Sequence, residues 1–154
     1  YIDGEQHVFL NDRDVNDLIR TSEVSENASK ISSIAKVREK LVAIQQEMAR
    51  NESVVMDGRD IGSVVLPDAD LKIYLTASVE VRAKRRYDEM ISKCESADLE
   101  TIMKDIEDRD YRDMHRENSP LVRVKDARLA DTSDLNIDEA TGFCLGLFSI
   151  VKKD

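Results

Sequence analysis

The hydrophobic positions of this chain follow two periods, one typical of helices and one typical of strands. Between about residues 21 and 50, apolar residues recur at helical spacing, which predicts an amphipathic helix preceded by a shorter helix that runs through Ser29. Helical spacing returns at about residues 79–90 and again from residue 99. A last helix beginning after Asn136 is apolar on most sides, so we expect it to pack against a sheet.

Strand signals are shorter and are bounded by turn residues. Residues 1–15 contain two turn signals, Asp3-Gly4 and Asn11-Asp12, which predict a small antiparallel hairpin or meander. Residues 71–75 and about 128–131 each predict a further strand.

The stretch from Ser53 to Gly62, SVVMDGRDIG, joins a predicted strand to a candidate ligand site. Its apolar run predicts a strand buried on both faces, as in a parallel sheet, and such sheets bind ligands beyond the carboxyl ends of their strands. Arg59 and Asp60 follow that end. A guanidinium can bind a phosphate with two hydrogen bonds, and a carboxylate can accept one from an amino or hydroxyl group. The alternative is a turn with a solvated Arg59–Asp60 ion pair, and the decapeptide alone leaves both open.

A second group of charged residues follows the helix that begins at residue 99. If that helix continues, Arg109, Asp113 and Arg116 fall at i, i+4 and i+7, on one face. Two guanidiniums around one carboxylate could hold a phosphorylated sugar, since the arginines suit phosphate and the aspartate accepts from hydroxyls. An exposed helix carrying ion pairs is the alternative, and this stretch by itself favours it.

Composition narrows the class of partner. The 154 residues carry a net charge of −9, which argues against nucleic acid or an anionic membrane as the main partner. Basic residues are nevertheless concentrated in residues 82–86 and 109–116, which favours a small anionic ligand. Cys94 and Cys144 have no metal-ligand spacing and predict reduced thiols of a cytoplasmic protein. No apolar run reaches the roughly 18 residues of a membrane-spanning helix.

Together these residues resemble the bacterial cytidylate kinase family, with consistent spacing through nearly the whole chain. The segment DGRDIG at residues 57–62, with its continuation to Pro67, is the most specific part of the resemblance. The other matching positions are Arg20-Thr21, Glu23-Val24, Ala28-Ser29, Val37-Arg38, Arg82, Arg85-Arg86, Arg109-Asp110, Arg112-Asp113 and Pro120-Leu121.

The resemblance implies a fold and an activity. The fold would be α/β, a P-loop kinase-like parallel sheet flanked by helices and lacking its first strand. Residues 1–50 would belong to a small antiparallel β/α monophosphate-binding insert, and residues 51–154 to the core, with a lid-like segment at about 82–97. The activity would be transfer of the γ-phosphoryl group of ATP to CMP or dCMP with Mg²⁺, giving CDP or dCDP.

The resemblance also implies a role for individual side chains, grouped by the part of the nucleotide that each contacts. Ser29, Arg38 and Asp60 would contact the cytosine ring, Arg109 and Asp113 the ribose, Arg59 and Arg116 the acceptor phosphate, and Arg85 or Arg86 the transferring phosphoryl group. No metal ligand and no residue of the ATP site is implied within this sequence.

One family motif is not found. None of the five glycines belongs to a G-x-x-x-x-G-K-[ST] loop, which would hold the ATP phosphates. In the family this loop lies near the amino terminus, so we expect the chain to be a piece of a longer kinase that is inactive alone. The sheet edge left by an absent first strand would favour self-association. The alternative is a non-catalytic nucleotide-binding or interaction module that keeps only the monophosphate pocket.

Overall fold

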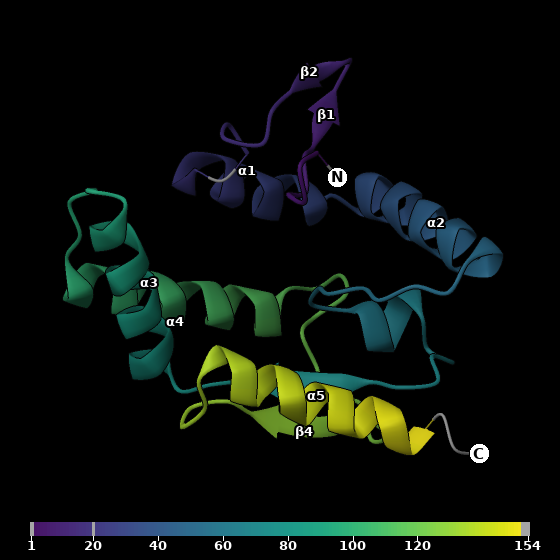
Figure 1. Ribbon diagram of the computed structural model, residues 1–154. Helices are drawn as coiled ribbons and strands as arrows, with labels where there is room; N and C mark the ends of the chain where they lie inside the picture. The colour runs from purple at the N-terminus through teal and green to yellow at the C-terminus, as the bar shows by residue number, and fades with distance from the viewer. Residues whose placement is uncertain (1, 20, 152–154) are drawn as a thin grey trace. The chain divides into compact units, whose positions relative to one another are not determined.

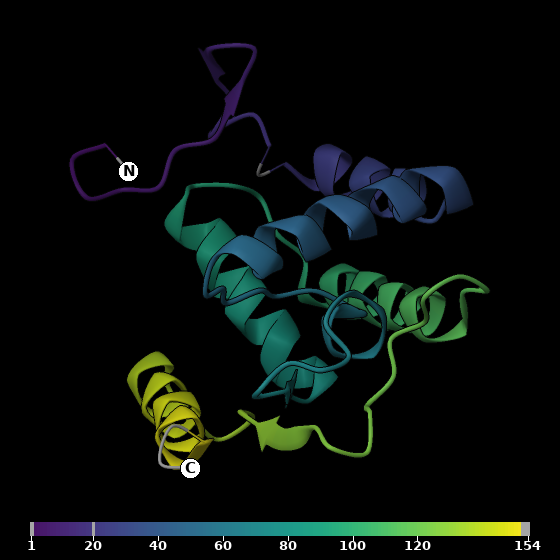
Figure 2. The same ribbon diagram turned by 90° about the vertical axis from the view of Figure 1, so that its right-hand side faces the viewer.

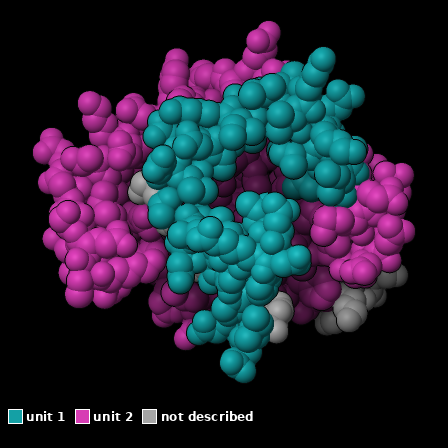
Figure 3. Space-filling model, turned by 90° about the horizontal axis from the view of Figure 1, so that it is seen from above, with its two compact units in different colours: residues 1–45 teal, residues 46–154 magenta. Residues whose placement is uncertain are grey.

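The computed structural model describes residues 2–19 and 21–151 of the chain (Figure 1). The chain forms two compact units, Tyr1–Gln45 and Gln46–Asp154, which Figure 3 shows in different colours. The boundary falls inside a helix, α2 (Ala35–Asn51), rather than in a linker. The division into a monophosphate-binding insert of residues 1–50 and a catalytic core of residues 51–154 remains a prediction about what each part does.

The first unit begins with the predicted hairpin. Strand β1 (Phe9–Leu10) pairs antiparallel with β2 (Arg13–Asp14), with Phe9 opposite Asp14. Asn11 and Asp12, which join the strands, have φ angles of 49° and 62°. Asn and Asp tolerate this left-handed conformation better than other side chains do, and two such residues suit a tight hairpin turn.

Two helices complete the first unit, as predicted. Helix α1 (Ser22–Ser32) begins after Thr21, whose hydroxyl accepts a hydrogen bond from the Val24 amide at 3.3 Å. Helix α2 follows after a short break. The apolar residues of α2 remain largely uncovered, since Leu41, Ile44 and Met48 are 40%, 45% and 57% exposed.

The second unit is built on a parallel pair of strands joined by two helices. Strand β3 (Ile73–Thr76) pairs with β4 (Arg128–Asp131), with Ile73 opposite Arg128 and Thr76 opposite Asp131. Helices α3 (Val79–Ser92) and α4 (Leu99–His115) form the crossover and pack against each other (Figures 1 and 2). The most buried apolar residues of the second unit are small, namely Val65, Ala83 and Ala130.

The strand predicted at Ser53 to Met56 is not formed, and that prediction is wrong. Val55 is fully exposed, and within the described residues the parallel sheet contains β3 and β4 alone. A strand needs a neighbour to take its backbone hydrogen bonds, and the pattern of apolar residues does not supply one. The segment runs instead into a short π-helix, η1 (Ile61–Val65). The chain is therefore mixed α/β, and its described residues form two small two-stranded sheets.

The last helix has the predicted start but not the predicted packing. Helix α5 (Ile137–Val151) begins with a capping box: the Glu139 amide donates to Asn136 Oδ1 at 2.9 Å, and the Asn136 amide donates to Glu139 Oε2 at 2.8 Å. The helix is not among the elements that pack extensively, and Leu145 and Phe148 are 60% and 51% exposed. No helix within the described residues is both long enough and apolar enough to span a membrane.

Candidate functional site

A buried carboxylate, Asp113, lies at the centre of a group of arginines in the second unit. Asp113 is 5% exposed. Arg59 Nε donates a hydrogen bond to Asp113 Oδ2 over 3.0 Å, and Arg109 Nε lies 3.9 Å from the same oxygen. Arg116 Nη1 lies 3.9 Å from Asp113 Oδ1. Three guanidiniums thus converge on one carboxylate, and we call these four residues the Asp113 cluster.

Helix α4 presents most of the cluster. It begins after Asp98, whose carboxylate accepts from the Thr101 amide at 2.8 Å and from the Thr101 hydroxyl at 2.6 Å. These hydrogen bonds lower the pKa of Asp98, with the hydroxyl as the larger cause. Arg109 and Asp113 are one helical turn apart, so they share a face of α4.

The end of α4 places the remaining arginine of that helix. Arg116 caps α4 with extended backbone angles, and its Nε donates to the Ser119 carbonyl at 2.6 Å. The Leu121 amide donates to the Asp113 carbonyl at 2.8 Å, which folds the following loop back onto the helix. The Arg116 side chain is only 15% exposed as a result.

The DGRDIG segment brings Arg59 and Asp60 to this unit. Asp60 is 3% exposed and precedes η1, where its carbonyl accepts from the Val64 amide at 2.9 Å and the Val65 amide at 3.2 Å. The Gln46 side-chain amide donates to the Val65 carbonyl at 3.1 Å. The backbone around Asp60 is therefore held from two sides.

Lys72 contacts the same segment through its side chain. A Cβ at Gly62 would lie 3.3 Å from Lys72 Cδ, so the lysine stem packs closely on the Gly62 backbone. Lys72 Nζ donates to the Pro67 carbonyl and, at 2.6 Å, to Asp126 Oδ2. That last bond is the main cause that lowers the pKa of Asp126.

The charge balance of the Asp113 cluster suits an anion. One carboxylate faces three guanidiniums, which leaves the cluster net positive. The Asp113 side chain is 7% exposed, whereas those of Arg59 and Arg109 are each 44% exposed. The negative charge is therefore internal and the positive charge accessible, as binding a phosphate requires.

Besides Asp60, four predicted site residues lie outside the Asp113 cluster. Ser29 lies in the second half of α1 and Arg38 in the first turn of α2, so both belong to the first unit. On α3, Arg85 donates to the Thr132 carbonyl at 2.6 Å and the Leu135 carbonyl at 2.9 Å. Arg86 pairs with Glu89 on its own helix at 2.9 Å. The roles of all four remain predictions.

Two features are associated with metal and ATP binding. Within residues 2–19 and 21–151 no group of three or more His, Cys, Asp or Glu side chains could hold a metal ion. The sequence also contains no G-x-x-x-x-G-K-[ST] loop. We therefore assign no residue of this chain to Mg²⁺ or to a loop that holds the ATP phosphates.

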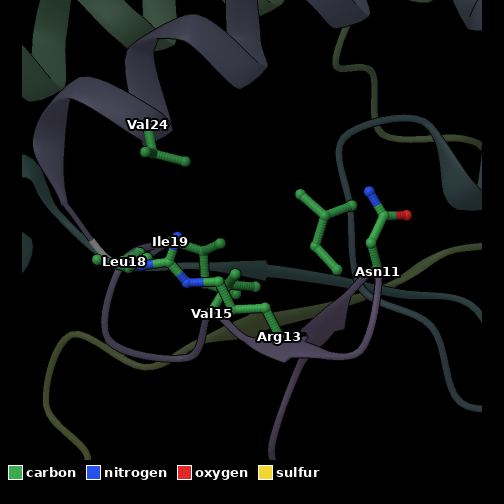
Figure 4. A pocket seen from close by; sticks show the side chains of 7 residues that line it. Asn11, Arg13, Val15, Leu18, Ile19 and Val24 are labelled. Carbon is green, nitrogen blue, oxygen red and sulfur yellow. The ribbon is translucent and has the colours of Figure 1, made fainter.

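A hollow in the first unit differs in character from the Asp113 cluster (Figure 4). It has a volume of about 500 Å³. Its lining is mainly apolar, with Asn11 and Arg13 as the polar members, and contains none of the predicted site residues: Leu10, Asn11, Arg13, Val15, Leu18, Ile19 and Val24.

Comparison with known proteins identifies the family of this chain. A sequence model of the cytidylate kinase family matches residues 2–148. The chain belongs to the cytidylate kinase family. It is 55% identical over 134 residues to a cytidylate kinase of Leuconostoc mesenteroides subsp. mesenteroides, covering 87% of this chain and 60% of the relative. It is 56% identical over 141 residues to a cytidylate kinase of Streptococcus sanguinis, covering 92% of this chain and 63% of the relative.

The family match confirms the resemblance seen in the sequence. It does not say which side chains bind the substrate. The chain spans less than two thirds of the length of these cytidylate kinases. The relatives are named as enzymes that act on cytidylate, and that name does not say which side chains of this chain touch it. A proposal about those side chains therefore rests on the geometry of the Asp113 cluster.

Proposed function

We propose that this chain supplies the acceptor site of an enzyme that transfers the γ-phosphoryl group of ATP to CMP or dCMP. The single observation that supports this most is the convergence of Arg59, Arg109 and Arg116 on Asp113 in a chain of the cytidylate kinase family. In this proposal the β3–β4 pair belongs to a P-loop kinase-like parallel sheet, residues 1–50 to the monophosphate-binding insert and residues 82–97 to a lid.

Arg59 and Arg116 would bind the acceptor phosphate. They approach Asp113 from opposite oxygens, so a phosphate seated beside them would meet two guanidiniums held by one carboxylate. Arg109 and Asp113 would bind the ribose, with the carboxylate accepting from a hydroxyl. Phosphoryl transfer asks the protein chiefly for alignment and for positive charge around the phosphate oxygens, which these arginines supply.

Asp60 would recognise the base, and the family resemblance gives Ser29 and Arg38 the same role. Cytosine presents an amino group beside ring acceptors, so a carboxylate accepts from the amino group and a guanidinium donates to the acceptors. Uracil would turn a carbonyl toward the buried carboxylate of Asp60, so two hydrogen-bond acceptors would face each other.

Arg85 or Arg86 would meet the transferring phosphoryl group. ATP would come with Mg²⁺, which neutralises charge on the transferring phosphates when bound. The proposal assigns no residue of this chain to the adenosine or to the α- and β-phosphates of ATP.

The test is phosphoryl transfer by the protein that carries this chain, measured with ATP, Mg²⁺ and each of CMP, dCMP, UMP and AMP. We expect CMP and dCMP to be the best acceptors. Equal or faster turnover of UMP or AMP contradicts the proposal. The 154 residues alone should bind CMP without producing ADP.

Calorimetry separates base recognition from turnover. Asp60→Ala should reduce the preference for CMP over UMP by about tenfold, because an unmet buried hydrogen bond costs about 1–3 kcal/mol. Asp70→Ala removes an exposed carboxylate from the segment that follows η1 and is the matched control. An unchanged preference in Asp60→Ala would exclude Asp60 from base recognition.

A second candidate is a non-catalytic nucleotide-binding or interaction module. The observation that favours it is that the Asp113 cluster is assembled while no donor-phosphate motif occurs in this sequence. CMP binding with no phosphoryl transfer by the protein that carries this chain would support this candidate over the kinase.

A further inference from the structure

Arg82, on the first turn of α3, joins three parts of the second unit. Its Nη1 donates to Asp110 Oδ1 at 3.0 Å and its Nη2 to Asp110 Oδ2 at 2.5 Å. Its Nε donates to the Ala77 carbonyl, just after β3, at 3.0 Å. Such a two-pronged guanidinium–carboxylate pair fixes direction as well as distance. Arg82 therefore ties α4 to α3 and to the end of β3.

Asp110 occupies a position from which the orientation of α4 can be set. It follows Arg109 directly and precedes Asp113 by three residues, so Asp110 and Asp113 lie on neighbouring rows of the helix surface. A bond that fixes Asp110 against α3 also fixes the rotation of α4 about its own axis. That rotation decides whether Asp113 faces Arg59.

We propose that Arg82 is a positioning residue for the acceptor site, acting through Asp110 to hold Asp113 toward Arg59. The inference rests on the proposed function for its consequence in catalysis, because Asp113 and Arg59 are the groups proposed to hold the ribose and the acceptor phosphate. Arg82 itself makes its bonds to protein groups and contacts no substrate in this role.

The neighbouring cations of α3 provide a contrast. Lys84 pairs with Asp88 at 2.7 Å and Arg86 with Glu89 at 2.9 Å, and both partners lie on α3 itself. Neither pair can orient α4. Lys84→Met is therefore the matched control, because it removes one positive charge from the same helix and leaves the Arg82–Asp110 bond in place.

The kinetic test compares Michaelis constants, which do not depend on how much of the enzyme is folded. Arg82→Met should raise KM for CMP by about tenfold, because small misplacements of binding groups are costly, and leave KM for ATP unchanged. Arg82→Lys should give a smaller rise, since an ammonium cannot reproduce the two-pronged pair. Asp110→Asn combined with Arg82→Met should add little to Arg82→Met alone.

Lys84→Met should leave both Michaelis constants unchanged. If Arg82→Met lowers only kcat or thermal stability and leaves KM for CMP unchanged, Arg82 has a purely structural role and the inference is overturned.

A nuclear magnetic resonance measurement tests the positioning step without any substrate. The Arg59 Nε–H is hydrogen-bonded to Asp113, which should slow its exchange with water and make its signal observable. We expect this signal in the unmodified protein and in Lys84→Met, and its loss in Arg82→Met. An unchanged Arg59 signal in Arg82→Met overturns the inference. If the unmodified protein transfers no phosphoryl group to CMP, the proposed function fails, while this signal still decides whether Arg82 orients α4.

Discussion

Arg59 donates a hydrogen bond to Asp113 across 54 residues of sequence, from the loop before η1 to the last turn of α4. The acceptor is almost fully buried while the donor remains 44% exposed. The bond thus fixes an arginine whose outer nitrogens can still meet a ligand. Arg109 and Arg116 approach the same carboxylate, so Asp113 orders the three arginines and offsets part of their positive charge.

Removal of Asp113 should therefore cost more than removal of any one arginine. In Asp113→Ala three guanidiniums face one another without their shared carboxylate, and we expect unfolding free energy to fall by about 3 kcal/mol. Arg59→Met leaves Asp113 with two cationic neighbours and should cost about 1 kcal/mol. Urea unfolding followed by circular dichroism measures both.

Asp105→Ala is the control for that comparison, because Asp105 lies on the exposed side of α4. It should change the unfolding free energy by no more than about 0.5 kcal/mol. Equal losses in Asp113→Ala and Arg59→Met would contradict the central place given to Asp113.

The start of α4 should contribute stability that depends on pH. Hydrogen bonds from Thr101 hold the pKa of Asp98 below 3.8 in the folded chain. The ionised carboxylate is therefore favoured by folding, and its contribution is present above the unfolded pKa and is lost as the pH falls through the lowered folded value.

Asp98→Asn isolates this effect, because Asn keeps a capping oxygen but carries no charge. The unmodified chain should melt at a higher temperature than Asp98→Asn at pH 7, and the difference should close between about pH 5 and pH 2. Thermal melts of both chains across that range measure it. A difference that is independent of pH would show that the carboxylate charge contributes nothing.

Local signals in the sequence predicted the elements well. The capping box of Asn136 and Glu139 and the turn at Asn11 and Asp12 involve contacts within a few residues, so the sequence contains all that decides them. The exposure of Val55 could not be predicted in the same way, because burial of a strand depends on a partner elsewhere in space. The same reason applies to α5.

In the candidate site, too, contacts within one helix could be predicted from the sequence and contacts between distant segments could not. Helical spacing predicted the shared face of Arg109 and Asp113, whereas α4 ends at His115 and Arg116 reaches Asp113 from the extended C-cap. The family resemblance was needed to connect Arg59 to them. The Arg82–Asp110 pair was not predicted, because its members lie 28 residues apart in two helices that each look solvated and charged. Its only signal was that both positions match the family pattern without an assigned role.

Lys72 should control the ionisation of Asp126. The lysine side chain is 9% exposed and its bond to Asp126 is the main cause that lowers the pKa of that carboxylate. Lys72→Met should therefore raise the pKa of Asp126 toward 3.8, which carboxyl-carbon resonances followed through an acid titration report directly. Lys125→Met removes an exposed charge next to Asp126 in sequence and should move the pKa less. If both variants shift the pKa of Asp126 equally, loss of a nearby positive charge explains the shift and the hydrogen bond from Lys72 does not.

Arg85 and Arg86 should respond differently to the same substitution, although they are adjacent on α3. The Arg85 guanidinium donates to the Thr132 and Leu135 carbonyls, so Arg85→Met removes a hydrogen bond from each of these two acceptors between β4 and α5, and the Thr132 carbonyl keeps its bond from the Leu135 amide. Arg86 pairs with Glu89 on its own helix, and its side chain is 37% exposed, so a phosphate could replace that bond at little cost. We expect Arg86→Met to lower kcat for CMP phosphorylation with a melting temperature within about 2 °C of the unmodified enzyme, and Arg85→Met to lower the melting temperature by about 4 °C or more. Turnover lost in Arg85→Met but retained in Arg86→Met would assign the transferring phosphoryl group to Arg85, and would require its guanidinium to leave the two carbonyls during the reaction.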